Sequence, residues 1–183
     1  MFYALQRYCD HKPDDASALH LYALVCERLN LLDRAIELIG KSITILETAY
    51  EETEDVAIER QFIIAHANMG RLHFSAHDYQ SSLESFESAF GLLPESDEDS
   101  EASALRSRVH YGMGLANFKS GAIEDALEML EKAVETAEDQ PEFKAQATVV
   151  LAEVMWALGT DEPKETAKNL LLEWYEAPVR MVM

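Results

Sequence analysis

Small residues and large apolar residues recur at fixed intervals along this sequence. From each of three anchor residues, Ala23, Gly70 and Gly114, a small residue follows after 12 and 19 positions and a large apolar residue after 16 positions. The small residues are Ala35, Ser42, Ser82, Ala89, Ala126 and Ala133, and the large ones are Ile39, Phe86 and Leu130. Because two antiparallel helices approach closely only where the facing side chains are small, this pattern predicts helix hairpins in close contact.

The segments that follow the anchors have the spacing of amphipathic helices. After a polar turn, each anchor is followed by "LLDRAIELI", "YQSSLESF" or "IEDALEML", in which apolar residues recur every three or four positions. Only 7 glycines and 5 prolines interrupt the 183 residues, which favours long helices. We therefore expect an all-α fold.

The pattern resembles the tetratricopeptide repeat, a helix–turn–helix unit with the mask W-x2-L-G-x2-Y, then A-x3-F, then a proline. The resemblance covers residues 16 to 138 in three units, and Pro94 stands where the terminal proline belongs. It departs from the mask at the first position, where Leu19, His66 and His110 replace the large aromatic residue. The resemblance implies a right-handed superhelical solenoid of antiparallel helix hairpins.

The repeat scheme divides the chain into a single solenoid of successive units. We expect the second helix of a preceding unit, three units, and a degenerate fourth unit or cap at residues 1–15, 16–54, 55–99, 100–140 and 141–183. Successive anchors lie 47 and 44 residues apart, whereas the standard period of the repeat is 34 residues. We expect the extra residues to form longer first helices and acidic turns at "EETED" and "ESDEDSE". In the last unit Ala152 matches the anchor, and Ala167 and Leu171 match later offsets after a three-residue insertion. Because residues 1–15 lack their first helix, we expect a segment of a longer repeat protein.

Residues that could carry chemistry are few. The glycines of "YGMGLANFKSG" lie within a helical pattern, whereas a phosphate-binding loop needs a strand before it and a helix that starts at its glycines. His73 and His77 could share one helix face toward a metal, but no third ligand accompanies them. Cys9 and Cys26 lack zinc spacing and are expected to be buried free thiols. We predict no catalysis, no cofactor and no metal; a helical enzyme or metal protein is the alternative.

The net charge of −19 limits the classes of partner. A surface this acidic repels phosphates, so we expect no direct binding of nucleic acid. No stretch approaches 18 continuous apolar residues, so no membrane span is expected. Protein partners are the remaining class.

In helix-hairpin solenoids the first helices line the concave groove. The residues off the packing stripe of these helices are therefore the candidate partner-binding residues: His20, Arg28, Asn68, Arg71, Phe74, Arg108, Tyr111 and Phe118. The aromatic residues would anchor an apolar partner, and Arg71 and Arg108 would bind its acids. The alternative is that these aromatic side chains only pack between neighbouring repeats.

We predict a non-enzymatic scaffold for protein–protein interaction. The sequence pattern of "YALVCERLNLLDRAIELIGKSITILETAYEETED" and the wide spacing of the units are similar to those of the scaffold subunits of the fungal superkiller complex. That resemblance implies a cytoplasmic protein that holds a helicase and propeller subunits together in mRNA decay. The alternative is a co-chaperone-like adaptor that binds a short peptide in the groove, although His20 and Leu24 stand where its carboxylate clamp would need Lys and Asn. Self-association through residues 1–15 is a further possibility.

Overall fold

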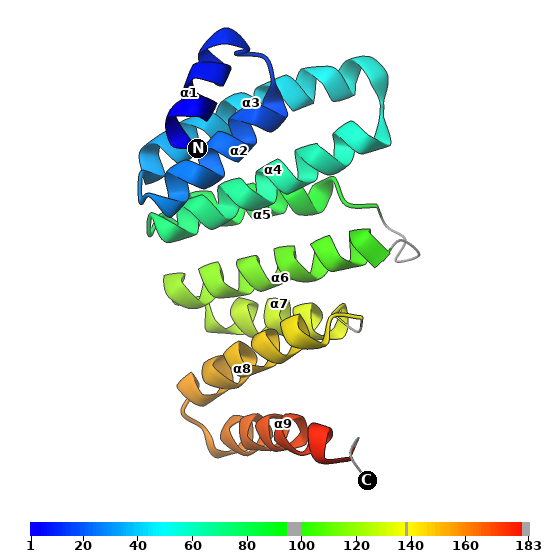
Figure 1. Ribbon diagram of the computed structural model, residues 1–183. Helices are drawn as coiled ribbons and strands as arrows, with labels where there is room; N and C mark the ends of the chain where they lie inside the picture. Colours follow the sequence, from blue (N-terminus) through cyan, green and yellow to red (C-terminus); the bar gives the residue numbers. More distant parts are fainter. Residues whose placement is uncertain (95–99, 138, 181–183) are drawn as a thin grey trace. The chain divides into compact units, whose positions relative to one another are not determined.

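The computed structural model describes residues 1–94, 100–137 and 139–180, and within these ranges it contains helices and no strand (Figure 1). The helices are α1 (Phe2–His11), α2 (Ala16–Arg28), α3 (Leu32–Thr53), α4 (Val56–Ser75), α5 (Tyr79–Gly91), α6 (Ser100–Ser120), α7 (Ile123–Glu135), α8 (Pro141–Ala157) and α9 (Asp161–Arg180). They form two compact units, one from Met1 to Leu93 and one that begins at Pro94. The expected all-α class is confirmed.

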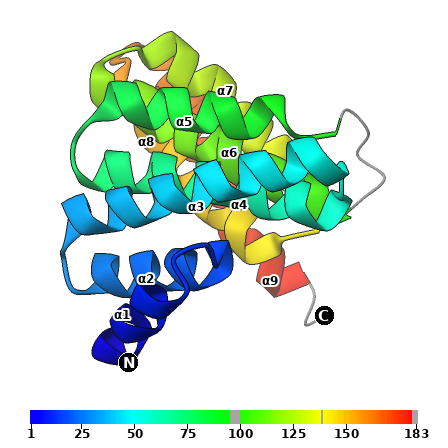
Figure 2. The ribbon, with the colours of Figure 1, turned by 90° about the horizontal axis from the view of Figure 1, so that it is seen from above.

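Each unit is built from hairpins of consecutive helices. In the first unit α2 packs on α3, α3 on α4 and α4 on α5, and in the second unit α6 packs on α7, α7 on α8 and α8 on α9. Figures 1 and 2 show the helices of the first unit lying beside their neighbours along the chain. No helix among the described residues is long and apolar enough to cross a membrane.

The anchors lie at the closest approaches between paired helices. Ala23 is completely buried, and Gly70 and Gly114 are buried too. A Cβ atom on Gly70 would lie 2.9 Å from the ring of Phe86, and one on Gly114 would lie 2.7 Å from Cγ of Leu130. Both partners stand 16 positions after their anchor, so the large residues of the pattern pack against the anchors, and the predicted close contact within the helix hairpins is confirmed.

Serine at offset 12 adds a polar contact to the same packing. The Ser82 hydroxyl is completely buried and donates to the carbonyl oxygen of Gly70 at 2.8 Å. This bond satisfies a polar group that would otherwise be costly to bury. A small polar residue can therefore replace alanine at this position.

The extra residues between the first two anchors form longer helices on both sides of a short turn. The first helices α4 and α6 have 20 and 21 residues, but α3, a second helix, is also long at 22 residues. The expected acidic turn at 51–55 is therefore shorter than predicted: α3 ends at Thr53, Glu54 is left-handed at φ 50°, and the Asp55 side chain accepts from the backbone N–H of Ala57. Of the second predicted turn, residues 95–99 lie outside the described residues.

The long ends of α3 and α4 have their own apolar core. Leu46 and Ala65 are buried together with Phe62. The Tyr50 ring lies 6.5 Å from that of Phe62, and its hydroxyl donates to Glu59 at 2.9 Å. This packing explains why α3 continues through acidic residues that the sequence suggested as a turn.

The two predicted thiols are buried and free. Cys9 lies in α1, where Phe2 and Leu5 pack with it against the core of α2 and α3. Cys26 belongs to the same core. In the second unit, Ala152 of α8 and Ala167 of α9 are buried as the register predicts, whereas Leu171 is 40% exposed.

Candidate functional site

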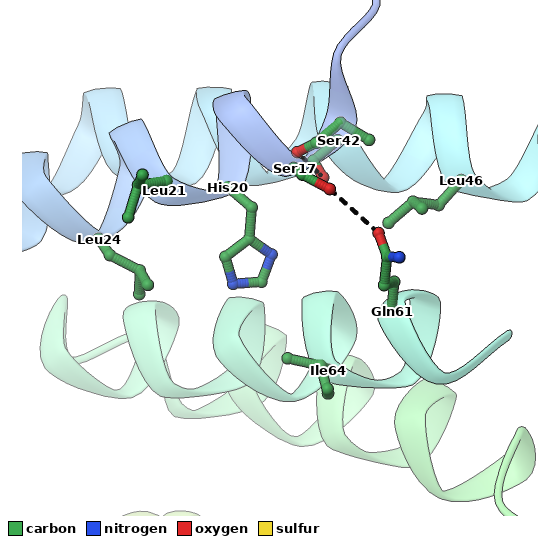
Figure 3. A pocket seen from close by; sticks show the side chains of 9 residues that line it. Ser17, His20, Leu21, Leu24, Ser42, Leu46, Gln61 and Ile64 are labelled. Carbon is green, nitrogen blue, oxygen red and sulfur yellow. Dashed lines mark hydrogen bonds between the residues drawn. The ribbon is translucent and has the colours of Figure 1, made fainter. Parts of the chain in front are cut away.

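A pocket lined by α2, α3 and α4 opens in the first unit (Figure 3). It has a volume of about 230 Å³ and is lined by Ala16, Ser17, His20, Leu21, Leu24, Ser42, Leu46, Gln61 and Ile64. The figure shows the His20 ring extending from α2 toward α4, with Leu21 and Leu24 to one side of it. Leu21 is 47% exposed, so the apolar wall of the pocket continues onto the surface.

Two side chains of α2 that line this pocket, Ser17 and His20, make polar contacts with α4. The Ser17 hydroxyl donates to Oε1 of Gln61 at 3.2 Å, a bond drawn in Figure 3. His20 Nε2 lies 2.9 Å from the side-chain nitrogen of Asn68 on α4. If the amide donates this bond, the imidazole accepts it in its neutral form. Burial, and then the charge of Arg71, lower the pKa of His20, which favours the same neutral form.

Arg71 of α4 adds a third polar side chain beside His20 and Asn68, and these three residues form a polar row between α2 and α4. Its Nη2 donates to Oε2 of Glu27 at 2.9 Å and to Oδ1 of Asn68 at 3.3 Å, and Nη1 also pairs with Glu27. The Glu27 side chain is only 18% exposed. A carboxylate from a partner would therefore have to compete with Glu27 for Arg71.

The other two predicted residues of the first unit lie near the ends of their helices. Arg28 is exposed at the last position of α2. Phe74 is half-buried at the end of α4, and its ring packs on Tyr79 of α5 with centroids 5.5 Å apart. Of the predicted residues in this unit, the structure thus brings His20, Asn68 and Arg71 together and leaves Arg28 and Phe74 out of that row.

The three predicted residues of the second unit all lie on α6. Arg108 is exposed. The Tyr111 ring packs edge-on against Phe143 of α8 at 5.4 Å, its hydroxyl accepts from Gln146 at 3.2 Å, and burial raises its pKa. Phe118 packs against the core of its unit, with the Lys119 ammonium 5.4 Å from its ring centroid. Both aromatic side chains therefore pack against other helices of the second unit, and their role in binding a partner stays a prediction.

The charges of the first unit are divided unevenly between its helices. Of the helices that line the pocket, α2 and α4 carry Glu27 and Glu59 against Arg28, Arg60 and Arg71. The other hairpin helices, α3 and α5, carry Asp33, Glu37, Glu47, Glu51, Glu52, Glu84 and Glu87 against Arg34 and Lys41. Among these four helices the acidic side chains are thus concentrated on α3 and α5, although α3 also contributes Ser42 and Leu46 to the pocket.

Sequence reasoning missed most of the pocket wall. Leu21 and Ile64 carry no motif; the available signal was their position off the packing stripe of α2 and α4. Histidines proposed as an alternative metal pair have other contacts, since His73 faces Asp78 at 3.8 Å and His77 faces the Tyr79 hydroxyl at 3.1 Å. Within the described ranges, no group of three or more His, Cys, Asp or Glu side chains could hold a metal ion.

Comparisons with known proteins agree with this geometry. The family model described as "Tetratricopeptide repeat" matches residues 107–140. The chain is 29% identical over 174 residues to Superkiller protein 3 of Schizosaccharomyces pombe and 26% identical over 171 residues to Superkiller protein 3 of Saccharomyces cerevisiae. These alignments cover 95% and 93% of this chain but only 12% of each relative, so the chain spans about an eighth of their length.

Solved structures of similar fold have little sequence identity to this chain. The crystal structure of MamA aligns with a TM-score of 0.74 at 17% identity, covering 98% of this chain and 89% of that one. The TPR-like repeats of a putative kinesin light chain from Podosopora anserina align with a TM-score of 0.66 at 16% identity, covering 91% and 76%. The chain therefore carries a tetratricopeptide repeat at residues 107–140 and resembles the tetratricopeptide-repeat family in fold over nearly its whole length.

Proposed function

We propose that this chain is a non-enzymatic scaffold segment that binds a folded protein partner on the α2/α4 face of its first unit. The observation that carries the proposal is the apolar pocket that continues onto the surface at Leu21. Apolar pockets that lie open on a surface receive the anchoring side chains of partners. The likeness to Superkiller protein 3 supports a role in a superkiller-type complex, with helicase and propeller subunits as partners in cytoplasmic mRNA decay.

The alternative function is an adaptor that binds a short acidic peptide in the groove. It would use Arg71 as a carboxylate clamp, but Arg71 is already bound in two places by Glu27. A peptide would gain little by replacing one carboxylate with another, because the exchange adds no net ion pair. This contact favours a folded partner that fills the pocket over a short peptide held by charge.

The test is binding to a reconstituted subcomplex of superkiller helicase and propeller subunits, measured by isothermal titration calorimetry. We expect binding that Leu21→Gln weakens by roughly 5- to 30-fold, since a buried apolar anchor contributes on the order of 1–2 kcal/mol. The matched control is Leu29→Gln, because Leu29 is also exposed on the surface at the end of α2 but does not line the pocket. Equal effects of both variants, or binding only of free acidic peptides, would contradict the proposal.

A further inference from the structure

The hydrogen bonds of Asn68 determine which nitrogen of His20 carries the proton of the ring. Oδ1 of Asn68 accepts from Nη2 of Arg71 at 3.3 Å, so the amide nitrogen is the atom that lies 2.9 Å from Nε2 of His20. An amide nitrogen only donates hydrogen bonds, and Nε2 therefore accepts this one. A neutral imidazole that accepts at one nitrogen carries its proton at the other, so Nδ1 of His20 is a donor.

This donor belongs to the pocket of the first unit. Figure 3 shows Nδ1, the ring nitrogen next to the side-chain stem, on the side of the His20 ring that faces Ser17 and Gln61. Within the described part of the chain, the only hydrogen bond of the His20 ring is the one at Nε2. The Ser17 hydroxyl gives its one proton to Oε1 of Gln61 at 3.2 Å, so its oxygen can still accept a hydrogen bond. Because Ser17 and His20 are three residues apart on α2, they share one face of that helix, and the pocket offers a donor and an acceptor together.

The walls of the pocket are apolar, and its size is that of one side chain. It is lined by the apolar residues Leu21, Leu24, Leu46 and Ile64. Its volume of about 230 Å³ is below the roughly 300–1,000 Å³ of pockets that hold drug-sized molecules. An apolar cavity of about 150 Å³ already accommodates a benzene ring. The pocket therefore has room for one aromatic ring with a small polar substituent.

The two polar groups select among side chains of this size. A phenylalanine would leave the Nδ1 donor of His20 without a partner, and burying an unsatisfied donor costs free energy. A lysine or arginine brings donors only, and the charge of Arg71 repels it. A carboxylate would lose its hydration in an apolar pocket that supplies one donor from His20. A phenol hydroxyl accepts one hydrogen bond and donates another, which matches His20 and Ser17 together.

We propose that this pocket receives a tyrosine side chain of the partner, whose hydroxyl accepts from Nδ1 of His20 and donates to Oγ of Ser17. The inference rests on the proposed function, because it names the side chain that anchors the partner on this face. The two fail separately. A subcomplex that binds through Leu21, although the pocket has no preference for tyrosine, overturns only the tyrosine assignment. A preference for tyrosine without binding of the subcomplex overturns only the proposed function.

The test is a titration of the whole chain with N-acetyl-tyrosinamide and with N-acetyl-phenylalaninamide, followed by NMR of the leucine and isoleucine methyl groups. The two probes differ only in the hydroxyl. For the tyrosine derivative we expect the methyl signals of Leu21, Leu24 and Ile64 to shift with a dissociation constant on the order of 1 mM, because one side chain makes few contacts. The phenylalanine derivative should bind about 5- to 10-fold more weakly, although it is the more apolar molecule, because it leaves the donor of His20 unpaired.

A substitution at His20 locates this preference. His20→Phe keeps an aromatic ring but has no donor, so the two probes should bind it equally. The matched control is His11→Phe, because His11 is exposed at the end of α1 and does not line the pocket; this variant should keep the preference. The comparison of the two probes on the unchanged chain does not depend on the folding of any variant. Equal or tighter binding of the phenylalanine derivative to the unchanged chain overturns the proposal. So do pocket signals that neither probe shifts, or a preference that survives His20→Phe.

Discussion

Corresponding positions of the two units have opposite surroundings. On α2, His20 and Glu27 are polar, and α4 meets them with Asn68 and Arg71. On α8, the corresponding Val149 and Trp156 are apolar and 40% and 59% exposed. The covered face thus uses paired polar groups at its edge, whereas the open face displays apolar groups that water does not favour. The polar pairing seen on α2 is therefore not repeated at the corresponding positions of α8.

The largest expected effect is a difference in the free energy of unfolding that is lost when a buried leucine of the first unit and an exposed leucine of the second unit are each replaced by alanine. Leu72 of α4 is 1% exposed in the core with α2 and α3, and Leu172 of α9 is 45% exposed. Leu72→Ala should lower the free energy of unfolding by about 2–5 kcal/mol, because it removes packing and leaves a cavity. Leu172→Ala should cost about 1 kcal/mol or less. Urea unfolding at concentrations where both variants are monomeric measures the difference, and equal losses would abolish the distinction.

A smaller effect concerns the ion pair at the edge of the covered face. A double-mutant cycle with Glu27→Gln and Arg71→Met should give a coupling energy of up to about 1 kcal/mol, decreasing with salt. The comparison pair is Lys41 and Glu37 of α3, whose side chains are 58% and 55% exposed. Its coupling should be smaller, about 0.3–0.5 kcal/mol, because solvent screens it more fully. A coupling for Glu27 and Arg71 below that of the exposed pair would contradict the role given to them.

The smallest effect is a pH dependence carried by His20. Burial and the charge of Arg71 lower its pKa in the folded protein, whereas the unfolded chain has the ordinary value of about 6.5. Below that pH the unfolded chain takes up a proton that the folded protein resists, so the free energy of unfolding decreases as pH falls. Above it, the contribution of His20 is fully present.

His66 shares this behaviour, because burial also lowers its pKa while Glu47 partly opposes the shift. His20→Gln should therefore reduce, but not remove, the loss of stability between about pH 7 and pH 5. Glutamine keeps an acceptor for Asn68, so the helix contact survives the substitution. Urea unfolding at several pH values measures the slope; an unchanged slope in His20→Gln would show that the imidazole is not buried as described.

The sequence predicted the parts of the fold that local packing rules determine. Gly70, Gly114 and their large partners could be identified because close helix contact demands small residues at fixed intervals. The length of α3 could not be predicted in this way. It depends on Phe62 of the next helix, α4, whose side chain packs with Leu46 in the same buried core. Here a tertiary contact between two consecutive helices overrides the local preference of acidic residues for a turn.

The candidate site was harder to predict for the same reason. His20 and Asn68 were identified from their place on the first helices, but their mutual bond joins residues 48 positions apart. The pairing of Arg71 with Glu27 depends on how α2 and α4 pack, which no motif records. Charge and helical position showed which side chains are available, and tertiary packing decided which of them remain free for a partner.

The helix hairpins of both units depend on one property: small anchor residues let paired helices approach closely. The most direct test is the free energy of unfolding of Gly70→Ala and Gly114→Ala against Gly40→Ala. Their added Cβ atoms would meet Phe86 at 2.9 Å and Leu130 at 2.7 Å, whereas that of Gly40 meets only the end of Met69 at 3.6 Å. We expect losses of about 1–3 kcal/mol at the two anchors, and no loss or a gain of up to about 1 kcal/mol at Gly40. Equal or stabilising effects at all three glycines would contradict the account.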